Sequence, residues 1–242
     1  MRLLSIGNSF SMDAHRWLHM LAKEHGVQME CVNLYIGGCS LQTHWGNVQN
    51  NAADYELGLD GERTTNFVSI QQALEMGKWD VVTLQQASRF SGMPETYEPY
   101  LSELAALVRQ YQPQAKLYFH QTWAYEVDVE NPGYQNYNCS QQQMYKCIVA
   151  ASDKAAASIN AELIPVGTLI QYLRENVKEF DYRNGGMSLC RDGYHLSWYY
   201  GRFAAAATWL RKLTGIDVHP IPLEECEMHI LQKIADAVNA IV

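Results

Sequence analysis

Charged residues are scarce in this sequence, and basic residues are scarcer than acidic ones. Only 18% of the 242 residues are Asp, Glu, Lys or Arg, and 26 acidic residues against 18 basic ones give a net charge of −8 at pH 7. A nucleic-acid-binding surface needs a basic stripe, and this sequence contains none, so we exclude nucleic acid as a partner. No uninterrupted apolar run approaches the roughly 20 residues that cross a bilayer, so we expect no membrane span.

Motifs typical of metal and nucleotide binding are missing as well. The six cysteines form no C-x-x-C pair and show no metal-ligand spacing, and the eight histidines are equally dispersed. We therefore expect free thiols in a reducing compartment and no metal site. No glycine-rich loop has P-loop or Rossmann spacing, which argues against a nucleotide-binding domain. No charged leader precedes the apolar residues 3–6, so the sequence as it stands predicts a cytoplasmic protein. A secreted or periplasmic protein would follow if a leader had been trimmed.

Short apolar runs alternate with longer segments of helical periodicity along the whole chain. The runs cover residues 2–6, 29–36, 79–84, 116–120 and 162–166. This alternation is typical of a parallel sheet with crossover helices, and each run is short and mainly apolar, as a strand covered on both faces should be. With 48% apolar residues, the chain is long enough to bury a three-layer core. We predict a single α/β domain over residues 1–242.

Two stretches depart from this alternation. Asp60-Gly61 lies between two short runs, which predicts a β-hairpin near residues 50–66, inserted after the second strand. Residues 123–138 form a long, aromatic-rich loop after the fourth strand. Loops of this length in a compact domain are often functional.

Polar residues follow the predicted strands at the points where ligands bind in parallel α/β sheets. The segments are Gly7-Asn8-Ser9-Phe10-Ser11, Gly37-Gly38-Cys39-Ser40, Gln85-Gln86-Ala87-Ser88 and, before a helix near the C-terminus, Arg191-Asp192-Gly193-Tyr194-His195. Acyl transfer requires a nucleophile, a base, a carboxylate that orients the base, and donors for the oxyanion. Taken alone, Ser9 or Ser11 could simply cap a helix, and Asp192 could simply begin a turn.

The order of these segments resembles the conserved blocks of the SGNH hydrolases. Gly7-Asn8-Ser9 resembles their first block, which usually reads Gly-Asp-Ser, and Asn33 with Gly38 and Ser40 resembles the second. Asp192 and His195 match the D-x-x-H of the last block. Two departures stand out: Asn8 replaces the usual aspartate, and the third block is absent. At that place Gln85-Gln86-Ala87-Ser88 resembles the Gln-Gly-Glu-Ser variant of sialate and acetylxylan esterase relatives.

The resemblance implies a fold, an activity and a set of roles. The fold would be a three-layer αβα sandwich with a flavodoxin-like parallel sheet, strand order 2-1-3-4-5, and no cofactor. Ser9 would attack the acyl carbon, His195 would act as base and then acid, and Asp192 would orient His195. The backbone N–H groups of Ser9 and Gly38 and the side chain of Gln85 would form the oxyanion hole.

The implied activity is that of a serine esterase, and the reaction we favour is O-deacetylation of a carbohydrate. A lipase or thioesterase of the same superfamily is an alternative, and so is a catalytically silent ligand-binding domain, because a fold does not fix a function. The partner would be a small-molecule or carbohydrate ester, and the oligomeric state stays open.

Other side chains could border the substrate. The candidates are His44, Gln86, Trp123 and Tyr125. The aromatic residues of the 123–138 loop could stack on a sugar, or they could anchor the loop to the core. Arg89 could bind an anionic group of the substrate, although a solvated position is the commoner one for an arginine.

Overall fold

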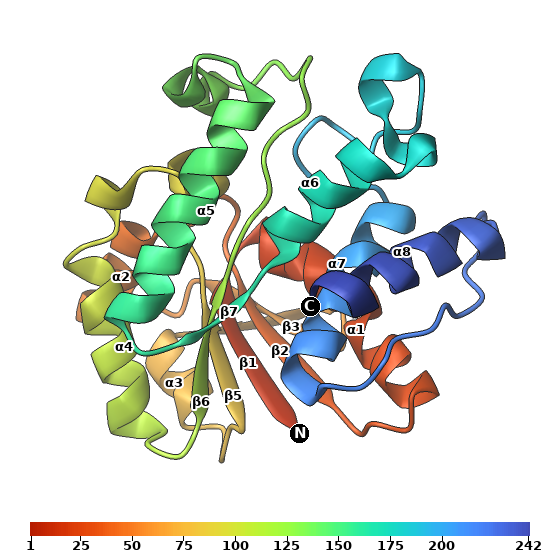
Figure 1. Ribbon diagram of the computed structural model, residues 1–242. Helices are drawn as coiled ribbons and strands as arrows, with labels where there is room; N and C mark the ends of the chain where they lie inside the picture. Colours follow the sequence, from red (N-terminus) through yellow and green to blue (C-terminus); the bar gives the residue numbers. More distant parts are fainter.

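A seven-stranded, mostly parallel sheet forms the centre of the molecule, with helices on both faces (Figure 1). The computed structural model describes residues 1–242. Each of the five predicted apolar runs contains one strand, and these five strands are parallel. They are β1 (Arg2–Gly7), β2 (Glu30–Tyr35), β5 (Val81–Leu84), β6 (Lys116–His120) and β7 (Glu162–Ile164). The predicted α/β class is therefore confirmed.

The remaining two strands form an antiparallel hairpin that extends the sheet beyond β2. They are β3 (Tyr55–Leu59) and β4 (Glu62–Val68), and the full order is β4-β3-β2-β1-β5-β6-β7. Asp60 and Gly61, with φ of 50° and 86°, form the tight turn between them, as a two-residue hairpin loop requires. The expected order 2-1-3-4-5 matches the five parallel strands, β2-β1-β5-β6-β7, and is incomplete because the hairpin adds β3 and β4 beside β2.

Helices cover the sheet because its strands are apolar on both faces. Adjacent strand residues contribute to opposite core clusters, as in the pairs Leu3 and Leu4, Cys31 and Val32, and Val81 and Val82. The helices are α1 (Ser9–Glu24), α2 (Leu41–Asn50), α3 (Ile70–Leu74), α4 (Tyr100–Tyr111), α5 (Gln141–Ser158), α6 (Val166–Asn176), α7 (Tyr200–Thr214) and α8 (Met228–Ile241). Helices α1, α6, α7 and α8 belong to one cluster, and α2, α3, α4 and the second half of α5 to the other (Figure 1). None of the helices has the length and hydropathy needed to cross a membrane.

Candidate active site

The turn from β1 into α1 presents the Ser9 hydroxyl because a different residue caps the helix. Asn8 is the N-cap: its side-chain oxygen accepts a hydrogen bond from the Phe10 N–H at 2.9 Å. The Ser11 hydroxyl accepts from the Asn8 N–H at 3.1 Å and completes the capping box. Capping is therefore the role of Asn8 and Ser11, and Ser9, the first residue of α1, keeps its hydroxyl free for another partner.

That partner is His195, 186 residues further along the chain. Its Nε2 lies 2.8 Å from the Ser9 Oγ, and its Nδ1 lies 2.7 Å from the Asp192 Oδ2. The second Asp192 oxygen accepts hydrogen bonds from the backbone N–H groups of His195, at 2.7 Å, and Tyr194, at 3.2 Å. Asp192 thus both begins the turn and holds the imidazole, so the two interpretations of this residue are compatible. The three side chains form one hydrogen-bonded chain ending at a serine hydroxyl.

Asp13 attaches the segment 191–196, which contains His195, to α1, which begins with Ser9. The sequence did not single out this aspartate. Asp13 is one helical turn after Ser9 on α1 and is 1% exposed. Its carboxylate accepts hydrogen bonds from Arg191 at 3.0 Å, from Arg202 at 2.8 Å and from the backbone N–H of Leu196 at 2.8 Å. These bonds bracket residues 192–195 on both sides. Asp13 therefore sets the position of His195 relative to Ser9.

Burial and hydrogen bonding have opposite effects on the Asp192 carboxyl. Burial raises the pKa of Asp192, but the hydrogen bonds from the His195 side chain and backbone outweigh it and hold that pKa below its usual value. Asp192 is consequently an anion at neutral pH. An anionic acceptor at the Nδ1 fixes the imidazole tautomer that leaves the Nε2 as the acceptor of the serine proton.

The serine and the histidine open into a cavity of about 330 Å³ at the carboxyl ends of the strands. Twelve residues line it: Asn8, Ser9, Phe10, Tyr35, Gly37, Gly38, Ser88, Arg89, Tyr125, Asn131, Tyr194 and His195. Gly38 has φ of +62°, a conformation that favours glycine, in the turn after β2. The backbone N–H groups of Ser9 and Gly38 make no hydrogen bond to another part of the protein, so both can donate to a ligand.

Gln85 and Gln86 do not line this cavity, which corrects two expectations. The Gln85 amide N–H donates to the Asn8 Oδ1 at 2.7 Å, and its oxygen lies 2.9 Å from the Nδ1 of His120. Gln86 points to the opposite side, where it bonds Thr96 and the Leu41 N–H. Both amides are 1% exposed, so their hydrogen bonds are made inside the protein. Gln85 contacts Asn8, the capping residue of the turn that contains Ser9, and not the space in front of the Ser9 hydroxyl.

Two more of the four candidate substrate contacts, Trp123 and His44, are likewise buried away from the cavity. Trp123 is stacked on Phe10 with ring centroids 4.2 Å apart and donates its indole N–H to the Tyr194 carbonyl at 2.7 Å. His44 stacks on Tyr55 and bonds its hydroxyl at 2.9 Å. Both are at most 1% exposed and neither lines the cavity, so neither contacts the space in front of Ser9.

The aromatic loop after β6 therefore anchors itself to the core and does not form a stacking platform. Tyr134 and Tyr137 are also buried, each 1% exposed. Tyr125 is equally buried, 1% exposed, but it does line the cavity, and its hydroxyl lies 2.8 Å from the Ser88 hydroxyl.

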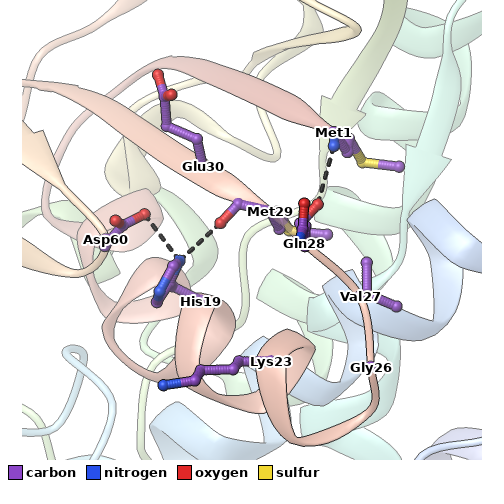
Figure 2. A pocket seen from close by; sticks show the side chains of 9 residues that line it. All are labelled: Met1, His19, Lys23, Gly26, Val27, Gln28, Met29, Glu30 and Asp60. Carbon is purple, nitrogen blue, oxygen red and sulfur yellow. Dashed lines mark hydrogen bonds and ion pairs between the residues drawn. The ribbon is translucent and has the colours of Figure 1, made fainter.

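A larger cavity, of about 700 Å³, lies at the other end of the sheet (Figure 2). It is formed where β1 and β2 begin, and Figure 2 shows the Met1 amine bonded to the Gln28 carbonyl and His19 placed between Met29 and Asp60. The His19 Nδ1 lies 2.6 Å from the Met29 carbonyl oxygen and 3.1 Å from an Asp60 oxygen. No serine, threonine or cysteine lines this cavity, so it lacks the nucleophile that acyl transfer requires.

Comparisons with known proteins agree with this architecture. A candidate SGNH hydrolase from Slackia heliotrinireducens is 23% identical, with a TM-score of 0.61, and the match covers 88% of this chain and 98% of that one. An acetylxylan esterase from Geobacillus stearothermophilus, solved as a catalytic mutant, is 14% identical, with a TM-score of 0.54 over 88% of this chain and 94% of that one. At these identities the likeness shows a common fold. No curated protein matches the chain.

A closer relationship is found with one family. The crystal structure of a DUF4886 family protein from Bacteroides uniformis is 38% identical, with a TM-score of 0.92, and the match covers 99% of this chain and 93% of that one. The family described as "Domain of unknown function (DUF4886)" matches residues 2–230. The chain therefore belongs to the DUF4886 family.

Proposed function

We propose that this protein is a serine esterase that hydrolyses carboxylic esters through an acyl-enzyme. The observation on which the proposal rests is the hydrogen-bonded chain from Asp192 through His195 to the Ser9 hydroxyl, which ends in an open cavity. A structural serine at a helix start would cap that helix, and here Asn8 does so instead. A buried nucleophile would have no access to substrate, whereas Ser9 is partly exposed.

The reaction would begin with attack of the Ser9 Oγ on the ester carbonyl carbon while the Nε2 of His195 takes the serine proton. Collapse of the tetrahedral intermediate breaks the bond to the alcohol oxygen, which receives that proton from the imidazolium. Water then attacks the acyl-enzyme with His195 again acting as base, releasing the carboxylic acid and regenerating Ser9. Asp192 stabilises the imidazolium in both halves of the reaction.

The oxyanion would be held by the backbone N–H groups of Ser9 and Gly38. Both residues line the cavity, and neither N–H has a partner elsewhere in the protein. Donors that are fixed before the reaction stabilise developing charge without reorganising. Gln85, which the sequence analysis put forward as a third donor, would act through Asn8, because its own N–H donates to that residue.

The substrate we favour has a short acyl group on a polar alcohol, with O-acetylated carbohydrate as the leading candidate. The cavity is small, and polar side chains such as Tyr35, Ser88 and Asn131 line it. A long acyl chain would need an extended apolar channel, which disfavours the lipase alternative. The acetylxylan esterases that share the fold make the same assignment reasonable for this chain.

The test combines covalent labelling with hydrolysis. A fluorophosphonate probe should add one label to the protein, peptide mapping should locate it on Ser9, and Ser9→Ala should abolish both labelling and release of nitrophenol from nitrophenyl acetate. Ser102→Ala, on the exposed face of α4, is the matched control and should label normally. Labelling that persists in Ser9→Ala would exclude Ser9 as the nucleophile. An unlabelled wild-type protein that releases no acetate would favour the silent ligand-binding domain.

The acyl preference can be measured on the same preparations. Nitrophenyl acetate should be hydrolysed with a higher kcat/KM than nitrophenyl octanoate, and acetate should be released from acetylated xylo-oligosaccharides. A preference for the octanoate would refute the short-acyl assignment while leaving the serine esterase assignment in place.

A further inference from the structure

Arg89 is the one permanently charged residue in the lining of the cavity that contains Ser9. The lining includes no aspartate or glutamate, and the guanidinium forms no ion pair with a carboxylate elsewhere. Other arginines of this acidic chain do form such pairs, as Arg174 does with Glu126 at 2.8 Å. An arginine without a carboxylate partner, at the mouth of a reactive cavity, has its charge available to a ligand.

The backbone of Arg89 is held firmly, so its side chain leaves from a fixed point. Its carbonyl accepts hydrogen bonds from the Asn136 amide and the Tyr137 hydroxyl, each at 3.1 Å. On the other side Gly133 packs so closely that an added Cβ there would lie 2.5 Å from the Arg89 Cβ. The buried aromatic loop thus has a function in the site after all, because it positions Arg89.

The guanidinium itself is restrained at one face and one nitrogen. It stacks over the Phe90 ring, 4.5 Å from its centroid, and its Nη1 donates to the Gly38 carbonyl at 3.3 Å. A guanidinium has five N–H donors, and this contact uses one of them. The remaining donors have no protein acceptor. Since Gly38 also supplies a proposed oxyanion donor, the free charge lies beside the place where the scissile ester would bind.

We propose that Arg89 binds a carboxylate on the ester substrate, so that this enzyme acts on esters of acidic compounds, such as an acetylated sugar acid, in preference to neutral ones. This inference rests on the proposed esterase function and adds a substrate class to it. A planar guanidinium matches the two oxygens of a carboxylate and binds it with two parallel hydrogen bonds.

The neighbours of Arg89 in the cavity suit an anion as well. The Tyr125 and Ser88 hydroxyls, 2.8 Å apart, share one hydrogen bond, which leaves one of the two free to donate to a ligand. Burial raises the pKa of Tyr125 to about 12, so the phenol is neutral at physiological pH and adds no negative charge to the cavity. The two carboxylates nearest Ser9 do not line the cavity: the oxygens of Asp192 are occupied by His195 and Tyr194, and those of Asp13 by Arg191, Arg202 and Leu196. An acidic substrate would therefore meet donors and one cation, with no opposing carboxylate in the lining.

The test compares, for each of two isomers, a pair of acetate esters that differ in one charge. The substrates are the meta and para isomers of acetoxybenzoate and their methyl esters, and the quantity measured is the ratio of kcat/KM for the carboxylate to that for its methyl ester. For at least one isomer, Arg89→Gln should lower this ratio about tenfold, as expected for loss of one charge-assisted hydrogen-bonded contact. Arg89→Lys should give an intermediate ratio. Arg211→Gln, which makes the same charge change on the far end of α7, should leave the ratio at the wild-type value.

Salt provides a second readout that a purely structural role would not affect. Raising NaCl from 0.05 to 0.5 M should lower the ratio in the wild-type protein and not in Arg89→Gln, because the attraction is screened only where the charge is present. Equal losses on both esters in Arg89→Gln would mean that Arg89 only positions Gly38, and would overturn the inference while the esterase assignment stands. If neither ester is hydrolysed and the fluorophosphonate does not label Ser9, the esterase assignment itself fails.

Discussion

Replacing Asp13 with asparagine should separate the position of the acid–base pair from its chemistry. Asp13 touches neither substrate nor reacting atoms, but Arg191, Arg202 and the Leu196 N–H all donate to its carboxylate. Asparagine has the same shape, but its amide nitrogen would replace one carboxylate oxygen and would be a donor that faces the N–H donors of Arg191, Arg202 or Leu196. The change therefore removes a charge and at least one hydrogen bond from the point where residues 191–196 attach to α1.

The structure sets the size of the effect. Removing one partner of a buried ion pair typically costs about 3–5 kcal/mol, because the remaining charge is left without compensation. Arg191 and Arg202 are partly exposed, with side-chain exposures of 21% and 10%, so water can solvate them in part and we expect the lower end of that range. Loosening of the segment should also move His195 away from Ser9, and small misplacements of a catalytic group cost about a hundredfold in rate.

The assay pairs urea unfolding with turnover of nitrophenyl acetate. Asp13→Asn should unfold with a free energy lower by about 3 kcal/mol and should lose most of its kcat under conditions where it is still folded. Asp217→Asn is the matched control, because it breaks a surface pair with Arg211 whose aspartate is 82% exposed, and such pairs contribute about 0–1 kcal/mol. A folded Asp13→Asn protein with wild-type kcat would refute the positioning role, whatever its stability.

Two further predictions concern the buried polar groups beneath the site. Gln85→Ala should lower the unfolding free energy by about 1–3 kcal/mol, because it removes a hydrogen-bond partner from Asn8 and from His120. It should lower kcat roughly tenfold, which is less than the 10²–10³-fold cost of losing a direct oxyanion donor. A kcat loss in that larger range with unchanged stability would restore Gln85 as a direct donor. Burial lowers the pKa of three histidines from 6.5 to about 3, so the unfolded chain binds more protons than the folded one between those values. The contribution of these neutral histidines to the unfolding free energy should be fully present above about pH 6.5. Below that pH the unfolding free energy should fall, by about 2 kcal/mol per histidine at about pH 5. Equal unfolding free energies in urea at pH 7 and pH 5 would contradict this. The three are His15, His44 and His120.

The parallel core of the fold could be predicted from the sequence because its strands are buried on both faces. In a strand such as Lys116–His120, three consecutive apolar residues, Leu117, Tyr118 and Phe119, are flanked by polar ones at both ends. The hairpin's turn was also visible at Asp60-Gly61, since few residue pairs adopt that geometry. The sequence did not indicate where the hairpin attaches to the sheet, which is through the pairing of β3 with β2. The residues of the hairpin do not specify a neighbour, and those of β4 are largely exposed.

Some residues of the candidate site could be predicted from the sequence, and others could not. Ser9, Gly38, Asp192 and His195 were predicted from the resemblance of short motifs, in their order along the chain, to the SGNH blocks. Ser9, Gly38 and His195 line the cavity, and Asp192 hydrogen-bonds His195. Asp13 escaped notice because an aspartate in an amphipathic helix is usually solvated, and its partners lie 178 residues or more away.

Side-chain direction in irregular segments was the other source of error. The aromatic residues after β6 are as compatible with an open platform as with a buried anchor, and only the packing of Trp123 against Phe10 decides between them. Gln85 was expected to reach the oxyanion and Gln86 to border the substrate, but the two side chains point to opposite sides and neither direction leads to the cavity. Alternation along a strand gives relative orientation and not the identity of what lies on each side.

The two departures from the SGNH pattern, Asn8 and Gln85, are explained by one hydrogen-bonding arrangement. The Asn8 amide donates to the Cys39 carbonyl at 3.0 Å while its oxygen accepts from Phe10 and from Gln85. A carboxylate at position 8 could accept the same two bonds but would place an oxygen against the Cys39 carbonyl, where a donor is needed. An amide at position 8 therefore ties the turn that contains Ser9 to the turn that contains Gly38, and the Gln85 amide supplies the donor that completes this arrangement.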